Sequence, residues 1–379
     1  MSNASPKPED SSKTKDAPSQ SQEPAQLSRG FWTDVLVRFF RRPMAVIAFT
    51  FVAILSLIAL TAPLIVGTKP IVCKYKGHIY FPALGYLNRK WENPIFTNDR
   101  FRLVYPKSLK EKDPDSWAVW PLIYQDPNRR VREDEWGDDR PANPTKDEGR
   151  PSSNNFFGTT AAGVDVFAMM VHGTRTALLI GFVSMGIAAF IGIVIGAAAG
   201  YLGGWMDILL SRLIEIVMSV PQLVLILALI ASIEKPTVWH IMIVLGFRNW
   251  TSIARLTRAE FLRLKTLDYI AASQALGANQ IRIMFRHILP NALAPILVPI
   301  SFGIAAAILI ESALSFLGFG PPPPNPSWGT LLAAGRENLN MWWLTLFPGL
   351  AIFSTVLAYN LIGEGLQEVT DPRLREAGK

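Results

Sequence analysis

Long apolar runs alternate with polar segments along this chain. The first run, residues 44–66, is uninterrupted and matches the roughly 20 residues that a helix needs to cross a bilayer. Further apolar runs cover residues 176–200, 208–233, 238–253, 292–316 and 342–362. Because each run has or approaches a membrane-spanning length, the pattern predicts an all-α membrane protein with six transmembrane helices.

The chain ends differ from these runs. Residues 1–28 are rich in Ser, Pro, Lys and Gln and have little to bury, so we predict a disordered tail. Residues 29–43 place apolar side chains at helical spacing beside arginines, which favours an amphipathic helix at the membrane interface. A simple anchor before the first span fits the same pattern. Residues 365–379 are expected to form a second tail.

The basic residues predict an orientation. Arginines just before the first span indicate that the N-terminus lies inside, because short cytoplasmic flanks carry an excess of Lys and Arg. Six crossings then place both tails and the basic segment 254–291 in the cytoplasm, and residues 67–171 outside. The tryptophans of 67–171 favour a small folded insert, and a loose proline-rich loop is the alternative. The remaining spans form a core over residues 172–364.

Small residues in the second span suggest how it packs. Gly192, Gly196 and Gly200 recur every four residues, which places them on one face of a helix. Such a face lets a neighbouring helix approach closely, so we predict a packing surface there. The third span contains Pro221, and we expect a helix that continues through it.

Ionisable residues inside apolar runs are candidates for a transport path. Arg248 lies in the short fourth run, Glu311 in the fifth, and Glu215 lies one turn from Arg212 in the third. Charged groups at membrane depth usually face a bundle interior or a water-filled cavity. For Arg248, a boundary shifted by a few residues would instead leave it at the interface. For Glu311, a structural role supporting its helix is the other interpretation.

Composition narrows the chemistry. The formal net charge is +7, but the basic residues gather at the ends of apolar runs, which favours membrane orientation over nucleic-acid binding. A single cysteine, Cys73, excludes an intrachain disulfide and thiol–metal clusters. The sequence contains no Gly-x-x-x-x-Gly-Lys-Ser/Thr phosphate loop, no His-Glu-x-x-His and no Gly-x-Ser-x-Gly. We therefore expect no catalytic residue, metal or cofactor in this chain.

The stretch DYIAASQALGANQIRIMFRHILPN, from Asp268 to Asn291, predicts two short helices. Thr266 is a candidate N-cap of the first, and Gly277 provides a left-handed stop after it. Asn279 can cap the second, which Pro290 is expected to end. The second helix would expose an apolar stripe made of Ile281, Met284, Phe285 and Ile288.

This stretch resembles the coupling loop of ABC importer permeases, whose signature is Glu-Ala-Ala, three residues, Gly, about nine residues, a hydrophobic position and Leu-Pro. The family glutamate is Ala271 in this chain, and its second alanine is Ser273. The resemblance implies that an ATP-binding subunit contacts this loop. The residues concerned would be Ala271, Ala272, Ser273, Gly277, Arg282, Arg286, Leu289 and Pro290.

The resemblance extends from about residue 157 to residue 375. Segments such as AGYLGGWMDILLSRLIEIVMSVP and ESALSFLGFGPPPPNPSWGTLLAAGR are similar to dipeptide and oligopeptide permeases, in particular their C-type subunit. Within the external insert, GHIYFPALGYLNRKWENPIF is similar to the peptide and microcin C importer subgroup. The family fold is that of type I ABC importer permeases, here with a periplasmic insert between the first two spans.

The resemblance also implies a mechanism and partners. Alternating access would move peptides or peptide-like compounds across the bacterial inner membrane, driven by ATP and Mg bound to separate ATP-binding cassette subunits. A B-type permease, a periplasmic peptide-binding protein and membrane lipid are the expected partners, and nucleic acid is not. The cargo stays open among peptides, glutathione, metal complexes and peptide antibiotics. An ion-coupled secondary transporter that uses Arg248, Glu215 and Glu311 is the main alternative.

Overall fold

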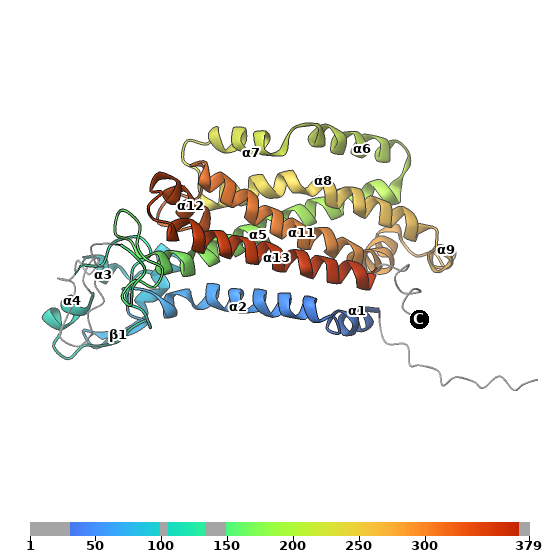
Figure 1. Ribbon diagram of the computed structural model, residues 1–379. Coiled ribbons are helices and arrows are strands. Elements are labelled where there is room, and N and C mark those ends of the chain that lie inside the picture. The colour runs from blue at the N-terminus through green and yellow to red at the C-terminus, as the bar shows by residue number, and fades with distance from the viewer. Residues whose placement is uncertain (1–30, 99–104, 133–148, 371–379) are drawn as a thin grey trace, which may run out of the picture.

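The computed structural model describes residues 31–98, 105–132 and 149–370. The tail predicted at 1–28 and the last residues of the chain lie outside this part. Long helices run side by side, with the insert at one end of the bundle and α1 (Phe31–Phe39) and α9 (Asp268–Ala275) at the opposite end (Figure 1). The bundle helices are α2 (Pro43–Ile65), α5 (Val166–Leu202), α6 (Gly204–Ser219), α7 (Gln222–Ala231), α8 (Val238–Lys265), α11 (Leu289–Phe316) and α13 (Trp343–Thr370).

Four helices in the described part are long and apolar enough to cross a membrane: Pro43–Ile65, Val166–Leu202, Gln280–Phe316 and Trp343–Thr370. A fifth crossing results if α6 and α7 together form one span. α8 has 28 residues, about 42 Å of helix, but arginines and other charged residues lower the hydropathy of its second half. The six predicted crossings therefore require both the α6–α7 pair and α8.

The third predicted span is not a continuous helix, which corrects the expectation from sequence. α6 and α7 meet at an angle of 81°. The break lies at Val220, which has extended backbone angles, and at Pro221. Proline disfavours helical angles in the residue before it and offers no backbone N–H, so a helix ends there readily.

α5 and α8 form the centre of the bundle and run in the same direction. Gly192 meets Trp250 and Ile253 of α8, and Gly200, two turns later, meets Phe261. A Cβ atom added at Gly196 would lie 2.4 Å from the carbonyl oxygen of Ala254, so no larger residue fits without movement. The predicted close-packing face of α5 is confirmed.

α1 (Phe31–Phe39) packs on the end of α13. Val35 and Phe39 are buried in a cluster with Val369, while Arg42 forms an ion pair with Glu368 at 2.9 Å. These contacts hold α13 as a helix as far as Thr370, so residues 365–370, predicted as part of a tail, are helical.

The insert has a small core of its own, which favours the folded interpretation over a loose loop. Its elements are β1 (Val72–Tyr75), β2 (His78–Tyr80), η1 (Pro82–Tyr86), η2 (Arg89–Trp91), α3 (Pro94–Asn98), α4 (Tyr105–Lys112) and β3 (Trp117–Val119). The strands form an antiparallel sheet in the order β2-β1-β3. One side of the sheet buries Cys73 and Tyr75 against Phe96, Tyr105 and Leu109. The insert ends earlier than predicted, since Asp165 caps α5 and the helix begins at Val166.

Candidate functional site

The glycine of the predicted coupling loop lies in an open turn. α9 (Asp268–Ala275) ends just before Gly277, whose φ angle of +76° is the left-handed conformation that the sequence predicts there. No atom lies within 4 Å of the position of an added Cβ. The predicted cap at Thr266 is wrong, because its hydroxyl donates back to the carbonyl of Arg263 at 2.9 Å and Leu267 occupies the cap position.

The second predicted helix does not end at Pro290, which is a further correction. The Asn279 side chain accepts a hydrogen bond from the backbone N–H of Ile281 at 3.1 Å and starts α10 (Gln280–Arg282). A π-helical turn, η4 (Ile283–Ile288), follows and continues directly into α11. The wider π turn absorbs the proline, whose missing N–H would interrupt a regular α-helix. One helix therefore runs from Gln280 to Phe316.

The segment 267–291 exposes apolar side chains to solvent, and we call this the docking surface. Leu276 is 88 % exposed, Ile281 64 % and Phe285 57 %. The predicted stripe is partly wrong: Ile288 is buried in the bundle, because the π turn rotates the face on which it lies. Of the loop residues that the resemblance implies, Ala271, Ala272, Gly277, Arg282 and Arg286 are exposed, and Ser273, Leu289 and Pro290 are half-buried.

The docking surface is firmly joined to the bundle. Ile270 of α9 is fully buried in the main core. The Lys265 ammonium donates to the carbonyl of Tyr201 at 2.7 Å, which links the ends of α8 and α5. The Asn291 amide of α11 donates to the Tyr269 hydroxyl of α9 at 3.4 Å. A force on α9 or α10 is therefore transmitted to several membrane helices.

The predicted pathway residues do not form a cluster. Glu215 pairs with Arg212 at 2.5 Å on an exposed side of α6. Glu311 is buried in α11 and accepts a hydrogen bond from Ser315 at 2.7 Å. Ser315 in turn accepts from Ser327, which caps α12 (Trp328–Glu337), so this chain of contacts joins α11 to α12. These contacts support the structural interpretation of Glu311.

Arg248 lies at the depth of the bundle centre. Two residues before it, Gly246 lies against Ser184 and Ile187 of α5. Two residues after it, the carbonyl of Trp250 faces Gly192. That level is the middle of the uncharged part of α5. Arg248 Nη1 is 3.5 Å from the Thr251 hydroxyl, and its buried Nε has no hydrogen-bond partner among the described residues.

Sequence reasoning missed two polar contacts that hold the broken span against α8. Arg258 donates to both carboxylate oxygens of Asp207, with Nη2 and Oδ2 2.7 Å apart. The Gln222 amide donates to the Asn249 carbonyl oxygen at 3.1 Å, next to the helix break. Asp207 and Arg258 are separated by 51 residues, so no local spacing indicates the pair.

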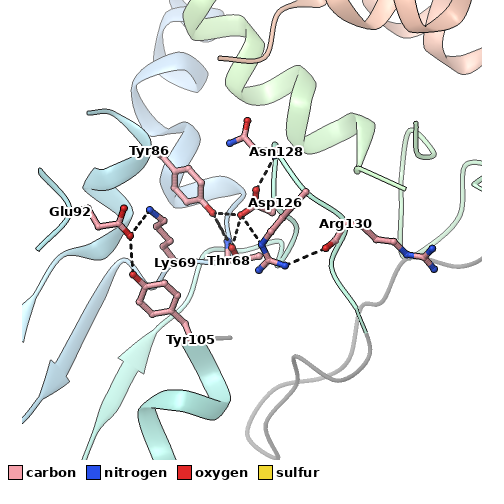
Figure 2. Close-up of polar contacts among 9 residues, drawn as sticks. Thr68, Lys69, Tyr86, Glu92, Tyr105, Asp126, Asn128 and Arg130 are labelled. Carbon is pink, nitrogen blue, oxygen red and sulfur yellow. Dashed lines mark hydrogen bonds and ion pairs between the residues drawn. The ribbon is translucent and has the colours of Figure 1, made fainter. Parts of the chain in front are cut away.

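A buried network fixes the insert to the bundle (Figure 2). One Asp126 carboxylate oxygen accepts hydrogen bonds from the Thr68 hydroxyl at 2.7 Å and from the Tyr86 hydroxyl at 2.9 Å. Burial raises the pKa of Tyr86 well above its usual value, and the negative charge of Asp126 adds to this effect. Arg175 of α5 donates to the Tyr86 carbonyl at 3.3 Å. The insert is thereby held to both α2 and α5.

Comparison with known proteins gives the family. Residues 192–376 match a family described as the inner membrane component of binding-protein-dependent transport systems, and residues 30–76 match the N-terminal transmembrane domain of oligopeptide transport permease C. A peptidoglycan transport system permease protein of Agrobacterium fabrum is 35 % identical over 340 residues, which cover 84 % of this chain and 87 % of that protein. The chain belongs to this family of binding-protein-dependent transport permeases.

Other similar proteins differ in how much of the permease they match. A putative peptide transport system permease protein of Brucella suis is 41 % identical over 229 residues, 60 % of this chain and 77 % of that protein. The Agrobacterium alignment is longer, and since the insert exceeds a quarter of the chain, 84 % coverage includes part of it. A solved chain of the MetNI methionine ABC transporter is 20 % identical, with a TM-score of 0.42, over 53 % of this chain and 97 % of its own length.

Family membership establishes the general role. The permease is a multi-pass inner-membrane subunit of an ABC importer, a class that works with ATP-binding and substrate-binding partners. The ion-coupled carrier is therefore rejected as the alternative.

Proposed function

We propose that the permease is the C-type membrane subunit of an ATP-driven importer that carries peptides or peptide-like compounds by alternating access. The docking surface supports this proposal most directly, because exposed apolar residues on a rigid helix end are what a partner that pushes on the bundle requires. Relatives named as peptide and peptidoglycan permeases support the cargo class.

ATP-binding subunits dock, in this proposal, on the surface formed by α9, α10 and η4. Leu276, Ile281 and Phe285 supply the apolar centre, and Arg282 and Arg286 the charged rim, an arrangement common in protein interfaces. Ala271 replaces the family glutamate, so apolar and basic contacts carry the docking instead of a carboxylate. In this proposal ATP and Mg bind to those partners rather than to this chain.

The opposite end and one side of the bundle meet the other partners. We place α9 and both termini in the cytoplasm and the insert in the periplasm, where it faces the peptide-binding protein. A B-type permease completes the path along the α6–α7 side, where Ile214 is the one buried residue of α6. Exposed apolar residues on that side include Trp205, Ile208, Leu213, Ile216 and Val224.

The test compares two exposed positions at opposite ends of the bundle. Phe285→Asp puts a charge into the docking surface, and Leu339→Asp puts the same charge on an 85 % exposed side chain between α12 and α13. Each variant is expressed with its neighbouring genes and purified in mild detergent. We expect the wild type and Leu339→Asp to co-purify an active ATPase, and Phe285→Asp to lose most of it.

Two results would contradict the proposal. One is an ATPase that accompanies Phe285→Asp as well as the wild type. The other is a folded, intact wild-type chain that brings no ATPase with it.

A further inference from the structure

Two arginines on α8 lie on the same helix face within the bundle. Arg248 and Arg255 are seven residues apart, which is close to two full turns. Ser252 lies between them on the same face and is exposed, as is Arg255. We call Arg248, Ser252 and Arg255 the arginine stripe.

The arginine stripe differs from the other arginines of α8 in its partners. Arg258 pairs with Asp207, and Arg263 pairs with Glu260 at 2.7 Å. Within the described ranges, neither Arg248 nor Arg255 lies within ion-pair distance of a carboxylate. Among the described residues, Arg248 contacts the Thr251 hydroxyl at 3.5 Å, and Arg255 contacts the sulfur of Met218 at 3.7 Å.

The depth of the stripe makes these unpaired charges informative. Arg248 is level with the middle of the uncharged part of α5, and Arg255 follows Ala254, whose carbonyl faces Gly196. An unpaired guanidinium exposed to lipid at such depth is unfavourable, whereas one that lines a water-filled cavity is tolerated. The stripe is therefore better suited to a water-filled path than to the lipid surface.

Other polar groups lie at the same level. Asn249 contacts Gln222 in the first turn of α7, directly after the break at Pro221. The first turn of α7 has no side-chain cap, so backbone N–H groups stay available at the depth of Arg248. Hydrogen-bond donors thus gather on the side of α8 that faces the broken span.

We propose that the arginine stripe lines the transport path and binds a carboxylate of the cargo during its passage. A guanidinium matches a carboxylate with two parallel hydrogen bonds, and two such groups about 10 Å apart along the helix offer successive positions for one anion. The carboxylate is the C-terminal group of a peptide or an acidic side chain. This inference rests on the proposed function as a peptide importer.

Transport of three probe peptides tests the proposal. The complete transporter is reconstituted in vesicles with saturating binding protein, and uptake and ATP hydrolysis are measured for trialanine, its C-terminal amide and an amidated peptide with one aspartate. Arg248→Gln and Arg248→Lys are compared with wild type. Arg263→Gln, an exposed arginine of the same helix that pairs with Glu260, is the matched control.

We expect wild type and Arg263→Gln to transport trialanine faster than its amide, by roughly tenfold if one charge-assisted hydrogen bond is involved. Arg248→Gln should remove this preference and leave ATP hydrolysis intact, and Arg248→Lys should restore part of it. Equal transport of the amidated aspartyl peptide and trialanine would assign the site to any carboxylate; slow transport of the aspartyl peptide would assign it to the C-terminus. Equal slowing of all three peptides by Arg248→Gln, or no change, overturns the proposal.

A second measurement does not depend on the choice of cargo. Ser252→Cys places a thiol within the stripe, and the native Cys73 is fully buried in the insert. In the assembled transporter we expect a negatively charged thiosulfonate reagent to label this thiol faster than a positively charged one, and Arg248→Gln with Arg255→Gln to reverse the order. No labelling, or no charge preference, refutes a water-filled cationic path.

The two measurements separate the two claims. If the wild-type complex takes up none of the three peptides, the proposed peptide importer is wrong, whereas the labelling of Ser252→Cys still decides the charge of the path.

Discussion

Replacing Gly196 by alanine tests whether the contact between α5 and α8 sets the stability of the bundle. The added Cβ would lie 2.4 Å from the carbonyl oxygen of Ala254 and 2.7 Å from the Cβ of Thr257. Both neighbours are parts of a buried helix and cannot rotate away. The two helices must therefore separate, or α5 must shift along its axis.

The size of the effect follows from these distances. A carbon and a carbonyl oxygen normally approach no closer than about 3.3 Å, so the helices must move apart by about 0.9 Å. A gap of that size removes between about a quarter and a half of the dispersion energy of the neighbouring contacts. Overpacking of this kind costs about 1–3 kcal/mol, and alanine recovers up to about 1 kcal/mol through helix propensity. The net loss therefore lies between about 0 and 3 kcal/mol, and about 1–2 kcal/mol is the expected value.

Thermal unfolding of the purified permease measures this loss. The control is Gly186→Ala in the same helix, because no atom lies within 4 Å of its added Cβ. A loss of about 1–2 kcal/mol lowers Tm by roughly 2–8 °C, whereas Gly186→Ala should leave Tm unchanged or raise it slightly. Equal Tm values for the two variants would show that the helices do not pack as described.

Three further predictions concern the insert and α12. Burial raises the pKa of the Cys73 thiol to about 12, so we expect maleimide to label it at pH 8 only after unfolding. Because the thiol ionises at lower pH in the unfolded chain than in the folded one, the free energy of unfolding should fall as pH rises above about 9. A pH-independent Tm in that range would contradict this. Asp126→Ala leaves the Thr68 and Tyr86 hydroxyls without their acceptor and should destabilise the insert by about 1–3 kcal/mol, seen as faster proteolysis than for the exposed control Asp115→Ala. Ser327→Ala removes the N-cap of α12, because the Ser327 hydroxyl accepts a hydrogen bond from the backbone N–H of Thr330 at 3.2 Å. This loss should lower the free energy of unfolding by about 1 kcal/mol in thermal unfolding, and an unchanged Tm would be the contrary result.

Local signals predicted much of this structure. The glycine spacing in α5, the left-handed Gly277 and the cap at Asn279 depend on neighbours within a few residues, and each is present as expected. Pro221 was visible in the sequence, but a proline alone does not distinguish a mild kink from a bend of 81°. At Pro290 the sequence predicts a helix end, but the helix continues because the π-helical turn before it accommodates the proline.

Contacts between distant segments were beyond sequence reasoning. The pair Asp207–Arg258 and the bond between Thr68 and Asp126 join residues more than 50 positions apart, and no periodicity marks them. The same limit applies to the arginine stripe. Spacing places Arg248 and Arg255 on one face, but only the structure shows which arginines of α8 have carboxylate partners.

The unbroken helix from Gln280 to Phe316 makes α11 a lever. The 37 residues from Gln280 to Phe316 extend for about 55 Å, and the part from Phe302 to Ile308 packs against Gly181 of α5 and Gly363 of α13. A rigid rod that pivots near its middle moves both ends by similar distances in opposite directions. A small sideways displacement at Ile281 would therefore reappear, reversed, near Glu311 and the start of α12, opening one end of the bundle as the other closes.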